Sequence, residues 1–130
     1  MWLGGAIGAA RMVLHYLGTK GSVDAHQAAA LAEAVSSCEA MQAVLDVAAD
    51  AIDADPDDRA RDAATRTLHV RRVVEVGASG VLRACGRASG SSPLVFDRAH
   101  ARRAADLAVY LRQHHAGRDL ERLGRRYLAC

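Results

Sequence analysis

The sequence predicts an all-α fold, an up-down four-helix bundle that forms a single domain over residues 1–130. A chain of 130 residues suits one domain with one hydrophobic core. It is rich in alanine and poor in β-branched and aromatic runs, which favours close-packed helices over sheet. Apolar residues recur every three or four positions over long segments, and both prolines, Pro56 and Pro93, fall between those segments.

The first helix is predicted at residues 2–18. Gly4, Gly5 and Gly8 lower its helix propensity but permit close approach by a neighbouring helix. Gly18 is suited to end it. No capping residue precedes the apolar run, which is the pattern of a chain that begins partway through a larger protein.

The second and third helices are predicted at residues 24–53 and 56–86. In each, apolar residues alternate spacings of three and four, as in the seam of a bundle. Between them lies an acidic turn, in which Asp55 can cap the third helix and Pro56 can occupy its first position. Together with Leu111 of the fourth helix, these seams predict a set of core residues. We expect the following to be buried: Leu31, Val35, Met41, Leu45, Ile52, Val70, Val74, Val81 and Leu111.

A loop rich in glycine and serine is predicted from Gly86 to Pro93. The fourth helix follows at residues 97–123, with Asp97 as its N-cap and Gly117 as the residue at which it would bend or break. Four helices with short connections give the up-down bundle.

The charge is unevenly distributed. Residues 1–82 carry 7 basic and 11 acidic side chains, whereas residues 83–130 carry 10 basic and 4 acidic ones. A basic C-terminal region can bind nucleic acid, an acidic partner or a phosphate-bearing ligand. Because aromatic stacking residues are nearly absent there, we expect no nucleic acid partner.

The cysteines and the N-terminal segment bear on the compartment. Cys38 and Cys85 lie in apolar helical stripes and, together with Cys130, lack metal-ligand spacing, so we expect buried thiols in a reducing cytoplasm. Arg11 and His15 interrupt the apolar N-terminal run, so we expect neither a signal peptide nor a membrane span.

The segment 110–124 carries the highest density of chemically active side chains. His114 and His115 are neighbours and point about 100° apart on a helix. Either one is partly buried and the other solvated, or one faces a cofactor or substrate as donor or acid/base. We expect no metal site, because Asp97 and His100 give only one loose approximation to the ligand pairs of a bundle di-metal centre.

The arginines of this region allow two interpretations. They can form a solvated face paired with nearby acids. Alternatively, one or two can bind phosphates together with backbone donors of the loop from Gly86 to Ser92.

The order of segments resembles the C-terminal domain of the acyl-CoA dehydrogenase superfamily, including its flavin-dependent hydroxylase-like members. The helix ending RACGRASG, the following SSPL and the arginine-rich ADLAVYLRQHHAGRDLERLG carry the resemblance. The segments WLGGAIGAARMVLHYL and LAEAVSSCEAMQAVLDVAADAID look like the first two helices of that domain. The resemblance covers residues 2–124.

The resemblance implies a C-terminal helical domain or split subunit of a flavoenzyme, with FAD bound between it and a β-domain. The cofactor-binding residues would be Gly86, Ser89, Ser91 and Arg103, and the catalytic residues would be His114 and His115. The family's N-terminal and β-domains are absent, so the chain would form a homo-oligomer, or a hetero-complex with a partner chain that supplies those domains. An acyl thioester would be the substrate.

Two other functions are consistent with the same residues. The chain can be a non-catalytic helical module that dimerises or regulates, derived from that domain but without its chemistry. More distantly, it can be a generic basic helical binding protein.

Overall fold

The computed structural model describes residues 1–129, and over these residues it is all-α with no strand, as predicted. Six helices follow one another along the chain: α1 (Trp2–Gly18), α2 (Ala25–Ala54), α3 (Ala63–Ser89), α4 (Ser92–Phe96), α5 (Arg98–Arg112) and α6 (Ala116–Leu128).

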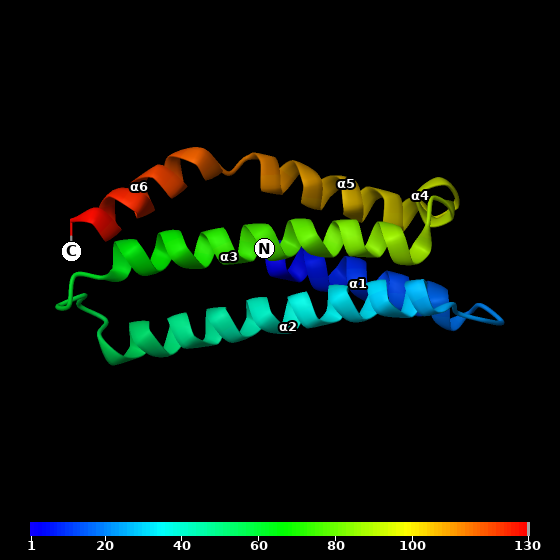
Figure 1. Cartoon of the computed structure of the whole chain (residues 1–130), viewed down its shortest axis with the longest axis horizontal. Helices are drawn as coiled ribbons and strands as arrows, with labels where there is room; N and C mark the ends of the chain where they lie inside the picture. The colour runs from blue at the N-terminus through cyan, green and yellow to red at the C-terminus, as the bar shows by residue number, and fades with distance from the viewer. Residues whose placement is uncertain (130) are drawn as a thin grey trace.

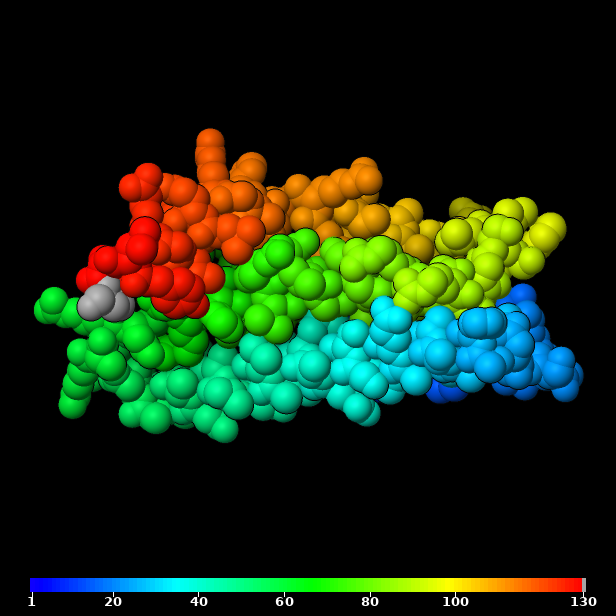
Figure 2. All heavy atoms as spheres, viewed as in Figure 1, coloured from blue at the N-terminus to red at the C-terminus, as the bar shows by residue number. Residues whose placement is uncertain are grey.

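The central element is α3, which packs against α1, α2, α5 and α6 (Figure 1). The molecule is elongated (Figures 1 and 2). Helix α1 covers only part of its length, with the N-terminus near the middle of the long axis (Figure 1). We therefore distinguish two halves. In the four-helix half, α1 and α5 pack with the first part of α2 and the last part of α3. In the three-helix half, α6 packs on the start of α3, which lies beside the end of α2.

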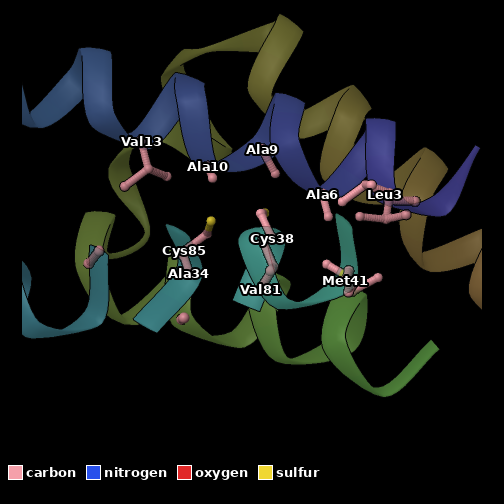
Figure 3. Close-up of a cluster of buried hydrophobic side chains, with 14 of the residues drawn as sticks. Leu3, Ala6, Ala9, Ala10, Val13, Ala34, Cys38, Met41, Val81 and Cys85 are labelled. Atoms are coloured by element: carbon pink, nitrogen blue, oxygen red, sulfur yellow. The ribbon is translucent and has the colours of Figure 1, made fainter. Parts of the chain in front are cut away.

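The core belongs to the four-helix half and consists mostly of small side chains (Figure 3). Alanines of α1, α2, α3 and the thiols of Cys38 and Cys85 are buried there. The helices approach closely: a Cβ added at Gly77 would lie 2.7 Å from Cγ and Sδ of Met41 across the α2–α3 contact. The alanine-rich composition therefore produces close helix packing, as the sequence indicated.

Most of the predicted core residues are buried or packed against the core. Met41, Val74 and Val81 are buried, which confirms the seam at these positions. Four others are half-buried against the core: Leu31, Leu45, Val70 and Leu111.

The prediction was wrong for Val35 and Ile52, which are 38% and 53% exposed. A seam averaging 3.5 residues drifts by about 20° per heptad around a straight helix of 3.6 residues per turn. Ile52, the last member of the seam, therefore turns away from the neighbour. It lies near the end of α2, in the half that α1 does not cover. Val35 instead lines the groove between α1 and α2.

The start of α2 agrees with the prediction, whereas the start of α3 does not. A capping box begins α2: the Asp24 carboxylate accepts a hydrogen bond from the Gln27 N–H at 2.8 Å. The predicted start of the third helix at Pro56 was wrong. Asp55 instead accepts hydrogen bonds from the N–H groups of Arg59 and Ala60, both at 3.0 Å, and so stabilises a loop. These two bonds also lower the pKa of Asp55.

The predicted fourth helix was wrong as a single element. Asp97 caps α5 as expected, accepting hydrogen bonds from the N–H groups of Ala99 and His100. The helix then breaks at residues 113–115 rather than at Gly117, and α6 continues past the expected end at residue 123. Because of this break, α5 packs on α1 while α6 packs on α3.

Candidate functional site

A buried polar cluster lies at the break between α5 and α6. The His114 side chain is 1% exposed. Its ring centroid lies 5.2 Å from that of Trp2, the first residue of α1, at an interplanar angle of 59°. The helix break therefore coincides with the start of α1, and the Trp2 ring covers the imidazole.

Two charged residues meet His114 from other helices. Nη2 of Arg71, on α3, lies 2.9 Å from Nδ1 of His114. Oδ2 of Asp119, on α6, lies 3.2 Å from Nη1 of Arg71 and 3.5 Å from Nδ1 of His114. Oδ2 of Asp119 is buried and accepts no hydrogen bond from any described residue. Its contacts with Arg71 and His114 are therefore electrostatic contacts that lack hydrogen-bond geometry.

This arrangement determines what His114 can do. Arginine only donates, so the hydrogen bond from Arg71 requires an imidazole that is unprotonated at Nδ1 and carries its proton on Nε2. In this arrangement the ring is enclosed by Trp2, bonded to α3 through Arg71 and close to the Asp119 carboxylate of α6. The cluster therefore anchors three helices at one point and leaves the ring little access to a ligand.

His115 lies outside this cluster and is exposed. Its carbonyl oxygen accepts hydrogen bonds from the N–H groups of Arg118 and Asp119 at the start of α6. One buried and one solvated histidine is the first of the two arrangements that the sequence allowed.

The glycine-serine loop is shorter than predicted, because α3 continues through Ser89. Gly86 is an exposed position within that helix, and Ser89 is 5% exposed with its Oγ donating to the Cys85 carbonyl at 2.9 Å. The chain leaves the helix at Gly90, whose φ of 69° suits glycine. Ser91, also exposed, then precedes α4.

The predicted site residues do not converge. Ser89 and Arg71, the partner of His114, are 18 positions apart on α3, a separation of roughly 27 Å at the usual helical rise. Arg103 lies on α5, and its side chain packs against α1 at Gly8. A Cβ added at Gly8 would lie 2.5 Å from Nη1 of Arg103. With Arg102 and Asp106 it lines a pocket of about 420 Å³ between α1 and α5.

Sequence reasoning missed a basic groove of about 710 Å³ between α3 and α6. Arg71, Arg122, Arg125 and Arg126 line it together with Asp119. The available signal was the spacing of three arginines at 122, 125 and 126, which share one face of a helix. A helix that ended at residue 123, as predicted, would leave Arg125 and Arg126 outside it, whereas α6 continues through Leu128 and includes all three.

The thiols are suited to packing rather than to reaction. Burial raises the pKa of the Cys85 thiol from 9.0 to about 11, with a smaller contribution from Cys38. Burial also raises the pKa of the Cys38 thiol, and the nearby charge of Glu39 makes a smaller contribution in the same direction. Low thiolate content makes both poor nucleophiles. Cys130 lies outside the described residues.

The described part of the chain contains neither a metal-ligand cluster nor a membrane-spanning helix. No group of three or more His, Cys, Asp or Glu side chains is placed to hold a metal ion among residues 1–129. Within the same range, no helix has the length and apolar character needed to span a bilayer.

Comparison with known protein families, curated proteins and solved structures finds no match to this chain.

Proposed function

We propose that this chain is a non-catalytic helical module that acts by self-association. The main support is the solvent-accessible surface area of the chain, which is large for its mass. The chain exposes 8411 Å², whereas a compact monomer of 13.8 kDa is expected to expose about 6,600 Å². Fifteen large hydrophobic side chains of the described residues are exposed on this surface, including Leu14, Val35 and Val47. Surfaces of this kind favour association.

The face best suited to a second copy of the chain is an apolar groove of about 340 Å³ between α1 and α2. Leu14 and Val35 line it and are 53% and 38% exposed. Arg11 on α1 and Glu39 on α2 also line it, and neither forms an ion pair with any described residue.

These two charges make the groove complementary to itself. In a two-fold dimer the same patch meets its copy, so that residue i contacts residue j of the partner and j contacts i. Arg11 of each copy can then pair with Glu39 of the other, while Leu14 and Val35 are buried between them. Opposite charges on one patch therefore favour a second copy over a partner of a single charge sign.

A charge exchange tests this dimer. Light scattering at tens of micromolar should give a dimer, and Arg11→Glu or Glu39→Arg alone should weaken it roughly tenfold or more through like-charge contacts. The double variant should recover the dimer, because the pair is restored with its charges exchanged. Arg98→Glu, an exposed change away from the groove, is the control. A monomeric parent, or a double variant as weak as the single ones, would contradict the proposal.

The second candidate is the C-terminal helical domain or split subunit of an acyl-CoA dehydrogenase-like flavoenzyme, incomplete alone and contributing to FAD binding and oligomerisation. The Arg103 pocket favours it, because an arginine lining an open pocket suits a phosphate group. The helical setting of Gly86 and Ser89 fits a phosphate-binding loop poorly. A partner chain would supply the missing domains, with an acyl thioester as substrate and the cytoplasm as location.

This candidate is tested with a chain that supplies the missing domains. The co-purified complex should be yellow, and Arg103→Ala should lower the flavin retained per complex, while the exposed control Arg112→Ala should not. His114→Ala should slow turnover with flavin still bound if the histidine acts in catalysis. A colourless complex, or equal flavin retention in the parent and in Arg103→Ala, would count against a flavoenzyme role.

A further inference from the structure

We propose that the groove between α3 and α6 binds a small molecule that carries a phosphate group and an apolar portion. The groove lies in the three-helix half, at the opposite end of the molecule from α4 (Figure 1). Figure 2 shows α6, in orange to red, lying against the start of α3, in green. The groove shares no lining residue with the α1–α2 groove, so the proposal is independent of self-association.

The charge of the groove favours an anion. Among residues 1–129, four arginines and a single acidic side chain, Asp119, line it. Asp119 is already engaged by Arg71, with Oδ2 3.2 Å from Nη1, and Arg125 binds Glu121 on the same helix. Arg122 makes neither an ion pair nor a hydrogen bond with any described residue. Its guanidinium is therefore available for the paired hydrogen bonds that arginine makes to phosphate.

The start of α3 contributes apolar lining rather than positive charge. Ala63 and Ala64, the first two residues of the helix, line the groove. The preceding residue, Asp62, does not cap the helix with its side chain and instead binds Nη1 of Arg66 at 2.6 Å. The Asp58 carboxylate, however, accepts hydrogen bonds from the N–H groups of Asp62 and Ala63 at 3.0 and 2.9 Å. The positive end of the helix is therefore already compensated, and the arginines of the groove hold the negative group.

The size and lining of the groove determine the rest of the ligand. A volume of about 710 Å³ lies within the range of small-molecule sites, and an inorganic phosphate would occupy only a small part of it. Ala63, Ala64 and Leu68 of α3 provide an apolar wall opposite the arginines of α6. A ligand that places its phosphate at Arg122 can pack an apolar portion on this wall.

Calorimetric titration of the full chain tests the proposal with three probes: phenyl phosphate, inorganic phosphate and benzyl alcohol. Phenyl phosphate should bind more tightly than inorganic phosphate, and benzyl alcohol should not bind. Arg122→Ala should weaken phenyl phosphate roughly tenfold or more, because hydrogen bonds to charged groups contribute that much. The matched control, Arg98→Ala, should leave affinity unchanged.

A second variant separates the two parts of the ligand. Ala64→Trp fills the apolar wall at an exposed helical position and should remove the advantage of phenyl phosphate over inorganic phosphate. Circular dichroism is used to check that each variant is folded. Equal weakening by Arg122→Ala and Arg98→Ala would show non-specific charge attraction and overturn the proposal, as would the absence of binding by either phosphate probe.

A final arm distinguishes a free phosphate compound from a lipid headgroup. Vesicles of phosphatidylcholine with and without phosphatidylserine are sedimented with the chain. We expect no co-sedimentation that depends on Arg122. If the vesicles capture the chain through Arg122 and phenyl phosphate does not bind, the groove recognises a membrane surface and the small-molecule proposal is wrong.

Discussion

Where α1, α2, α3 and α5 run side by side, the buried residues are mostly alanine, valine and leucine, and they form one continuous cluster. In the three-helix half, by contrast, neither the last part of α2 nor the first part of α3 contributes a fully buried residue. There α6 is held by Leu123, which is buried, and by Asp119, whose carboxylate meets Arg71 and His114.

This difference concerns how firmly each half is held together. Close apolar packing fixes the four-helix half, because its small side chains bring the helices together around one cluster. The three-helix half has fewer buried contacts and presents the basic groove and the exposed side chains of Val47 and Ile52. Regions with few buried contacts open more readily, and binding sites are often found in them.

The largest effect is expected from placing a charge in the four-helix half. Val74 is 6% exposed, so Val74→Asp would bury a carboxylate that has no partner. We expect this variant to lose more than about 3 kcal/mol of the free energy of unfolding, or to aggregate. Urea denaturation followed by circular dichroism measures the loss.

A variant one turn away provides the matched control. Val70 lies at the boundary of the two halves and is half-buried, so Val70→Asp can keep its carboxylate in contact with water. We expect a loss of about 1 kcal/mol, within the common range for single substitutions. If Val74→Asp and Val70→Asp are equally destabilising, the boundary between the halves is misplaced. A Val74→Asp variant as stable as the parent would contradict the core assignment.

The sequence predicted the four-helix half better than the three-helix half. Val74, Val81 and Met41 follow a helical period and are buried, because each faces a neighbouring helix along its length. Ile52 follows the same period and is exposed, because periodicity shows which face of a helix is apolar but not whether another helix covers it.

The α5–α6 break has no local sequence signal of comparable strength. Residues 113–115 contain neither proline nor glycine, and Gly117, the expected breaking point, lies within α6. The break instead occurs where His114 meets Trp2 and Arg71. These two residues precede His114 by 112 and 43 positions in the chain. Such long-range contacts override local propensity, and for the same reason the arginines of α6 could not be assigned to a groove in advance.

The smallest effect is expected from the polar anchor of α6. Asp119→Asn keeps the shape of the side chain but removes the charge that Arg71 meets. Because the Arg71 side chain is 45% exposed and water screens part of the interaction, we expect a loss of only about 1 kcal/mol. Hydrogen exchange should locate this loss in α6, with protection lowered about fivefold there and unchanged in α1.

Asp106→Asn is the matched control for this experiment. It removes an acid from an α5 pair in which Arg102 Nε and Asp106 Oδ2 are 3.7 Å apart and the two side chains are 80% and 59% exposed. Such a pair should contribute nothing measurable. If Asp119→Asn lowers protection equally in α1 and α6, the two halves unfold as one unit. In that case, the buried polar cluster stabilises the whole bundle rather than the docking of α6 on α3.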